Sequence, residues 1–116
     1  MSKVIKISSI TTMAMTEDAG MQLRNEMCKA IQQEESVVLD FEGIELFATP
    51  FFNASIGYFV MQLSPDKYQD RVNVKNLSDL GRETYSHSYQ NAVSVYENKT
   101  DLEMIGKITM ETIKDQ

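Results

Sequence analysis

Blocks of apolar and polar positions predict strands and helices in turn along the chain. Lys3–Ile10 alternates apolar with polar residues, which predicts a first strand. Thr16 is a good N-cap for a helix, and after it apolar residues recur every three or four positions as far as Gln33. We therefore expect an amphipathic helix from Thr16 to Gln33. The next run, Ser36–Phe41, is apolar almost throughout, and such a run is typical of a central strand covered on both faces.

A loop and a strongly apolar helix are expected after this central strand. Glu42–Ala48 lacks a regular period and predicts a loop. Thr49 and Pro50 have the residue types of a helix N-cap and a first helical position. Phe51–Ser64 is apolar on nearly all sides, which indicates a helix buried against the sheet or against a partner. The sequence Ser64-Pro65-Asp66 then ends that helix.

The last third of the chain repeats the alternation. Arg71–Leu77 predicts a strand, and Ser78 is a good cap for a third helix that ends at Asn98. Residues 99–116 fit a short strand and an amphipathic helix equally well. We therefore predict one α/β domain over residues 1–116, with its core at 3–98. Its small mixed or mostly parallel sheet should have about four strands, right-handed crossovers and helices packed against it.

Composition narrows the class of protein. The 116 residues carry a net charge of −6, and a chain this acidic gains no electrostatic attraction from nucleic acid or anionic lipid. The longest apolar stretch, 51–63, is too short and too polar to span a bilayer. The single cysteine, Cys28, excludes an intrachain disulfide, and Met1–Ile10 lacks the pattern of a signal peptide. We therefore expect a cytoplasmic protein that binds neither nucleic acid nor a membrane.

No group of residues predicts catalysis. His87 is expected on an exposed part of the third helix, and a catalytic role for it would need a nucleophile or carboxylate placed nearby. His87 and Cys28 lack the spacing of a metal site, and the five glycines are too scattered for a phosphate-binding loop. Glu42 and Glu45 follow a strand, but nothing orients them as an acid–base pair. We therefore expect no enzymatic activity, no metal and no cofactor.

The strand, loop and helix of Asp40–Gly57 are the best candidate for function. The carboxyl end of a parallel strand beside a helix N-terminus is a favoured functional location in α/β folds, and such an N-terminus favours anions. A phosphoryl group on Thr49 would lie at the positive end of the helix. In the simpler interpretation, the Thr49 hydroxyl only caps the helix. Met13 and Met15, in the connector before the first helix, are further interface candidates because methionine adapts to many partners.

The same segment resembles the STAS-like domain family of unknown function, a relative of the sulphate transporter and anti-sigma factor antagonist (STAS) domains. The resemblance lies in a hydrophobic strand that ends in Asp40-Phe41-Glu42-Gly43-Ile44, and in the later Thr49-Pro50-Phe51-Phe52-Asn53-Ala54 and Gly57. The order of strands and helices also matches from Lys3 to Asn98. The resemblance implies a STAS-like fold and a role in bacterial signalling.

In anti-sigma factor antagonists, the loop after this strand ends in Asp-Ser-Ser/Thr-Gly, and a partner kinase phosphorylates the first serine. That serine aligns with Thr49, whereas Ala48, Pro50 and Phe51 differ from the residues at the other three positions. The resemblance therefore implies that the partner is a histidine-kinase-like ATPase of the anti-sigma kind.

These arguments leave three functions open. The leading hypothesis is a non-enzymatic regulatory module that binds a signalling protein and is modulated at Thr49. One alternative is a self-associating subunit, for example a homodimer joined through Phe51, Phe52 or the C-terminal segment. The other is a domain that binds a small anionic ligand at the helix start beside Thr49. The residues expected at the partner-binding surface are Glu42, Glu45, Phe47, Thr49, Phe51, Phe52 and Asn53.

Overall fold

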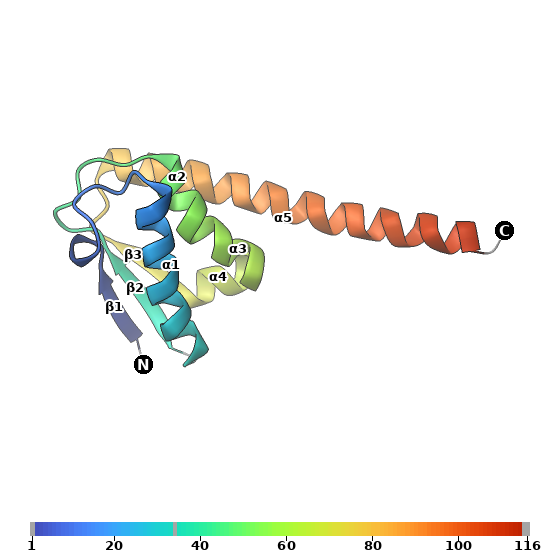
Figure 1. Ribbon diagram of the computed structural model, residues 1–116, viewed down its shortest axis with the longest axis horizontal. Coiled ribbons are helices and arrows are strands. Elements are labelled where there is room, and N and C mark those ends of the chain that lie inside the picture. The colour runs from blue at the N-terminus through green and yellow to red at the C-terminus, as the bar shows by residue number, and fades with distance from the viewer. Residues whose placement is uncertain (1, 34, 115–116) are drawn as a thin grey trace.

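Three parallel strands form the sheet of this protein (Figure 1). The computed structural model describes residues 2–33 and 35–114, with side chains described for residues 2–33 and 35–98. The strands are β1 (Ser2–Lys6), β2 (Ser36–Asp40) and β3 (Val72–Lys75), in the order β1-β2-β3. The predicted α/β class, the parallel pairing and the central place of β2 are confirmed. The sheet has three strands in the described part of the chain, rather than about four.

Helical segments connect the strands, and one of them, α4, was not predicted from the sequence. The segment α4 begins at Pro65, which ends the preceding helix as predicted but also occupies the first turn of a new one. Ser64 is its N-cap, with a φ of 81° and a hydroxyl that accepts the Lys67 N–H at 3.5 Å. The helical segments in chain order are η1 (Ile7–Ser9, 3-10), α1 (Glu17–Gln32), α2 (Thr49–Phe52), η2 (Asn53–Gly57, π), α3 (Tyr58–Leu63), α4 (Pro65–Arg71) and α5 (Asp79–Lys114).

The two outer strands are shorter than the sequence pattern suggested. The first strand ends at Lys6 rather than Ile10, because the chain turns into η1 and buries the Ile7 side chain completely. The third strand begins at Val72, since Arg71 is still part of α4. Thr16, in contrast, caps α1 as predicted, with its hydroxyl accepting the Ala19 N–H at 3.1 Å.

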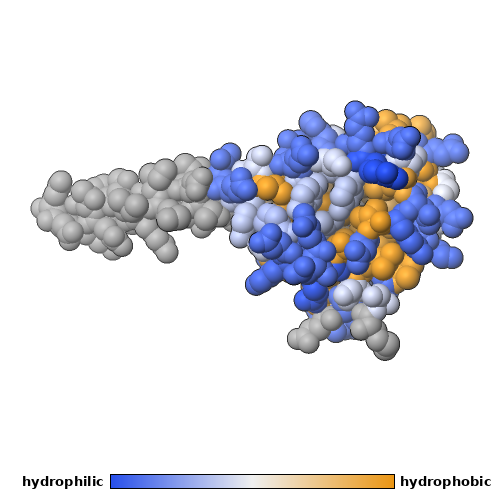
Figure 2. Space-filling model, turned by 180° about the vertical axis from the view of Figure 1, so that it is seen from behind, coloured by the Kyte–Doolittle hydropathy of each residue, from blue (hydrophilic) through white to orange (hydrophobic). Residues whose placement is uncertain are grey.

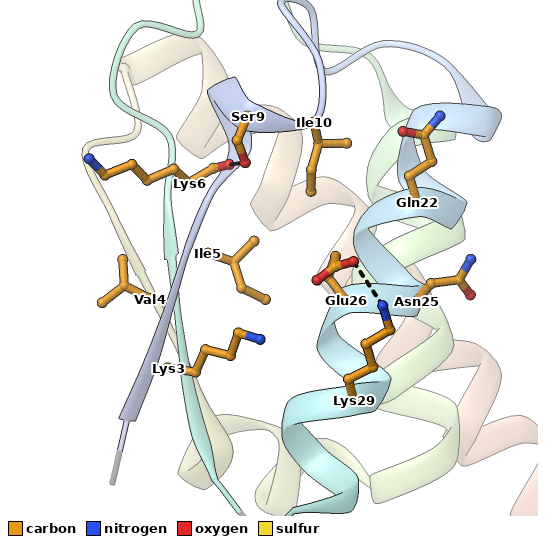
Figure 3. A pocket seen from close by; sticks show the side chains of 10 residues that line it. All are labelled: Lys3, Val4, Ile5, Lys6, Ser9, Ile10, Gln22, Asn25, Glu26 and Lys29. Atoms are coloured by element: carbon orange, nitrogen blue, oxygen red, sulfur yellow. Dashed lines mark hydrogen bonds and ion pairs between the residues drawn. The ribbon is translucent and has the colours of Figure 1, made fainter.

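The helices cover one face of the sheet and leave the other open in the part of the chain that the structure describes. Ile5 and Leu39 pair in register and are buried on the covered face. Val4 and Val38, one residue earlier in each strand, alternate to the other face, where Val4 is 49% exposed. Figure 3 shows Ile5 directed toward α1 and Val4 directed away from it. The prediction that β2 is covered on both faces is therefore wrong.

The helical run from α2 to α3 crosses α1 at close range. Gly20 permits this approach, because a Cβ atom there would lie 2.4 Å from the Phe51 carbonyl oxygen. That carbonyl accepts the Ser55 hydroxyl at 2.8 Å within the π-helical segment η2. Phe51, Ile56 and Val60 are fully buried. The predicted buried helix is thus confirmed, with a π-helical segment inside it.

The last helix, α5, packs on the core at its beginning and then extends away from the body (Figure 1). The Ser78 hydroxyl accepts the Gly81 N–H at 3.1 Å, so the predicted cap is confirmed. The predicted end at Asn98 is wrong, because α5 continues to Lys114. Of the two alternatives for residues 99–116, the helix is therefore the correct one as far as Lys114. No described helix is long and apolar enough to cross a bilayer.

Candidate functional site

Asp40, the last residue of the central strand, ties together the loops at the carboxyl edge of the sheet. Its Oδ1 accepts the side-chain amide of Asn76 at 2.8 Å and the Glu42 N–H at 3.0 Å, and its side chain is almost fully buried. Lys6 and Lys75 flank it on the neighbouring strands, with the Lys75 Nζ 3.9 Å from Oδ2. Asp40 thus holds the loop after β2 to the loop after β3.

The electrostatic environment of Asp40 keeps its carboxyl group ionised. The Asn76 amide has the largest effect, followed by the Glu42 N–H, and together they hold the pKa of Asp40 below its usual range. The charges of Lys75 and Lys6 act in the same direction, while burial opposes them. These contacts give Asp40 a structural role, which the sequence did not predict. The sequence feature that could have indicated this role is the single aspartate at the end of the strand, followed two residues later by a loop N–H that its side chain can accept.

The two segments predicted as interface candidates lie side by side. An isolated parallel bridge joins Ala14 to Phe47, with the Ala14 N–H donating to the Leu46 carbonyl at 3.0 Å. The Ala48 N–H donates in turn to the Ala14 carbonyl at 2.9 Å. The methionine connector and the 42–48 loop therefore form one continuous surface.

The start of α5 closes the same edge. A Cβ atom at Gly81 would lie 2.7 Å from the Phe47 ring, so α5 contacts the loop without an intervening side chain. The Phe47 ring also stacks on Phe52, with centroids 6.1 Å apart and planes 7° from parallel. The aromatic packing of Phe47 thus anchors the loop to the core, while Glu42, Glu45 and Leu46 are exposed.

Exposed apolar side chains from all three segments gather at this edge. We call the four exposed apolar residues Met13, Met15, Leu46 and Leu80, together with the carboxylates Glu42 and Glu45, the edge surface. Figure 2 shows apolar side chains reaching the surface at the end of the body that carries the sheet and the start of α5. Both glutamates are exposed. The apolar members are Met13 (47% exposed), Met15 (37%), Leu46 (50%) and Leu80 (53%).

The structure separates the predicted partner-binding residues into two groups. Glu42, Glu45 and Asn53 are exposed, and Phe47 and Thr49 are half-buried. Phe51 and Phe52 are completely buried in the core. Their assignment to an exposed contact surface is therefore wrong. The sequence could not separate them, because a helix that is apolar on nearly all sides does not show which side faces the core.

Thr49 does not cap the helix. It is the first residue of α2, and the N-cap position is occupied by Ala48, which has an extended backbone and no side-chain hydrogen bond. Pro50 follows within the first turn, as expected. The Thr49 hydroxyl is therefore not committed to the N-cap role that the residue types suggested, and its side chain remains half-exposed beside the edge surface.

The residues considered for chemistry lie apart from this edge. His87 is exposed on α5 and Cys28 is half-buried on α1, which agrees with the positions expected for them. Within the described residues, no three histidine, cysteine, aspartate or glutamate side chains are grouped as metal ligands would be.

A polar cavity of about 490 Å³ lies between β1 and α1 (Figure 3). Lys3 and Ile5 line it from the strand, and Gln22, Asn25, Glu26 and Lys29 line it from the helix. The Lys29 ammonium on its rim is paired with Glu26 at 3.3 Å. This cavity lies along the β1 edge of the sheet and extends to Ser9 and Ile10 just after the strand, and its lining is that of a solvated groove.

Comparison with known families supports the resemblance noted in the sequence. A family model described as the STAS-like domain of unknown function matches residues 19–82. The chain belongs to this family. The matched region runs from α1 to the beginning of α5, so this STAS-like domain includes β2, β3, the 42–48 loop and Leu80, while Met13 and Met15 precede it. Neither the curated proteins nor the solved structures compared with the chain gave a match.

Proposed function

We propose that this STAS-like protein is a non-enzymatic regulatory module that binds another protein through the edge surface. The observation that carries this proposal is the gathering of Met13, Met15, Leu46 and Leu80 from three separate segments into one exposed area. Contiguous exposed apolar side chains with a polar rim are typical of sites that bind another protein. Methionine and leucine side chains supply apolar contact area, and methionine adapts its shape to a partner.

Charge supports one type of partner. Glu42 and Glu45 are exposed beside Leu46, and Glu17 and Asp18 begin α1 just after the methionine connector. A surface with an apolar centre and acidic surroundings complements a partner with apolar and basic contacts. The signalling partner that we propose is a histidine-kinase-like ATPase of the anti-sigma kind, in line with the resemblance of the loop to anti-sigma factor antagonists.

The Thr49 side chain is the position at which we expect modification to regulate this binding. It is half-exposed, begins the helical run beside the loop, and is not used as an N-cap. A phosphoryl group there would add negative charge at the positive end of the run, where the charge is stabilised. Binding of a small free anion is less favoured, because Glu42 and Glu45 belong to the same loop and repel it.

Calorimetry with purified histidine-kinase-like ATPases from the same genome tests the binding. Leu46→Asp and Met15→Asp place a charge in the edge surface without touching the core, so we expect each to weaken binding by at least about tenfold. Val95→Asp, on a separate exposed part of α5, is the matched control and should bind as the wild type does. The proposal fails if no such ATPase binds, or if Leu46→Asp leaves the affinity unchanged.

A phosphorylation assay tests the regulatory part separately. Incubation with ATP and a binding ATPase should label the wild-type chain, and Thr49→Ala should abolish the label while keeping the affinity measured by calorimetry. Labelling that persists in Thr49→Ala would show that another residue is modified.

A further inference from the structure

A second surface, which shares no residue with the edge surface, is a groove of about 440 Å³ between α1, the helical run from η2 to α3, and α5. Small residues form part of its lining, and a Cβ atom added at Gly57 would reach only ordinary contact distance from Ala92, 3.9 Å. The larger apolar side chains of the lining are those of Tyr58, Met61 and Val95. Many small-molecule sites in proteins are apolar grooves of this size between helices.

The π-helical segment η2 forms one wall of this groove. It contributes Asn53, Ala54 and Gly57 to the lining. Its remaining two residues, Ser55 and Ile56, are completely buried, so the core fixes the position of the wall. Segments of π-helix are rare, and they occur frequently at functional sites. The groove is therefore preformed, and one of its walls has a backbone conformation that is typical of functional sites.

The polar side chains of the lining are hydrogen-bond donors without a partner. Arg24 on α1, Asn53 on η2 and Asn91 on α5 supply them. Within the described residues, none of these three side chains makes a hydrogen bond or an ion pair. The Arg24 guanidinium lies over the Tyr58 ring, with Cζ 4.6 Å from the ring centroid, a contact that leaves its N–H groups for other partners. No carboxylate lines the groove, which therefore complements an anion.

We propose that this groove binds a small amphipathic carboxylate, that is, a molecule with an aromatic or branched aliphatic body and one carboxylate group. The apolar body occupies the space beside Gly57, Ala92 and Tyr58, where its burial supplies affinity. The carboxylate accepts the N–H groups of Arg24, since guanidinium and carboxylate groups form strong paired hydrogen bonds. One guanidinium balances one negative charge, which favours a carboxylate over a phosphate monoester with nearly two charges.

Titration of the full isotope-labelled chain with phenylbutyrate, followed by proton–nitrogen correlation spectra, tests the proposal. We expect saturable shifts at Gly57, Ala92 and the Asn91 side chain, with a dissociation constant of about 1 mM or below. The neutral amide of phenylbutyrate keeps the apolar body but cannot pair with a charged guanidinium, so it should bind at least about fivefold more weakly. The proposal is overturned if no groove resonance shifts up to about 10 mM phenylbutyrate, or if the amide binds equally well.

Two matched variants test whether Arg24 selects the carboxylate. Arg24→Gln should weaken phenylbutyrate binding at least about fivefold, whereas Lys29→Gln removes the same charge from the same helix outside the groove and should bind as the wild type does. Val95→Asp adds a carboxylate to the lining and should also weaken binding. Equal binding by Arg24→Gln and the wild type, or equal weakening in Lys29→Gln, contradicts the proposal. Leu46→Asp should leave phenylbutyrate binding unchanged, which distinguishes failure of this proposal from failure of binding at the edge surface.

Discussion

The close approach of α1 to the Phe51 carbonyl makes Gly20 a sensitive position for stability. In Gly20→Ala, the new Cβ would lie 2.4 Å from the Phe51 carbonyl oxygen and 2.9 Å from the Ala54 Cβ. The first contact is with backbone, which cannot rotate away as a flexible side chain can. The two helices must therefore separate, and α1 loses part of its packing against the helical run.

The size of this effect follows from two opposing contributions. Overpacking of a core costs about 1–3 kcal/mol, and contact with a backbone atom places Gly20→Ala near the upper end of that range. Replacing glycine by alanine inside a helix stabilises it by about 1 kcal/mol. We therefore expect a net destabilisation of about 2 kcal/mol, which lowers the melting temperature by roughly 6–12 °C in a domain of this size.

Gly57→Ala is the matched control for this prediction. Gly57 also has helical backbone angles, but its nearest contacts would be the Phe52 carbonyl at 3.8 Å and the Ala92 Cβ at 3.9 Å. We expect Gly57→Ala to be neutral or up to about 1 kcal/mol more stable than the wild type. Urea unfolding followed by circular dichroism measures both variants. The reasoning is refuted if Gly20→Ala is as stable as the wild type, or if the two variants are destabilised equally.

Three further predictions concern buried polar groups. Ser55→Ala should destabilise the protein by about 1 kcal/mol, because it removes the hydroxyl that donates to the Phe51 carbonyl. Ser88→Ala should be neutral or stabilising, because the buried Ser88 hydroxyl has no hydrogen-bond partner in the described residues. Urea unfolding of the two variants should show this contrast, and equal losses of stability would contradict it. The lowered pKa of Asp40 means that its stabilising contribution is complete above about pH 4 and disappears as the pH falls through the folded-state pKa. In Asp40→Asn, the free energy of unfolding should therefore decline less between pH 5 and pH 2 than in the wild type, and an unchanged pH profile would refute this role. Partial burial raises the pKa of Tyr85 to about 12. An ultraviolet titration of the wild type should therefore show tyrosine ionisation that extends to higher pH than in Tyr85→Phe, and matching curves would argue against this raised pKa.

The local features of the fold could be predicted because they depend on nearby residues. Thr16 and Ser78 have the hydroxyl side chains that cap a following helix, and both do so. The apolar run of β2 marks the central strand, since a strand in the middle of a sheet buries more of its side chains. The predicted end of the first strand was wrong, because apolar Ile7 fits the alternation of a strand as well as it fits a buried turn. Only the packing of the folded chain shows that Ile7 is buried in a turn.

The features of the site that were not predicted depend on contacts between distant segments. The bridge from Ala14 to Phe47 joins residues that no local pattern relates, although each segment had been proposed separately as an interface. Leu80 belongs to the edge surface only because the Phe47 ring lies against Gly81. Phe52 is buried rather than exposed because its ring meets Phe47 and Tyr85 in the folded chain. Sequence patterns identified the correct loop, but they could not identify which of its side chains face outward.

The strand order of the sheet has a consequence for how the chain reaches its fold. Because β1, β2 and β3 lie in the same order in space as in sequence, each strand pairs with the one formed before it. No strand has to insert between two others that are already paired. Chains whose contacts are mostly between neighbouring segments fold faster, because they close shorter loops. The sheet can therefore be assembled in the order of the sequence, with β3 added last.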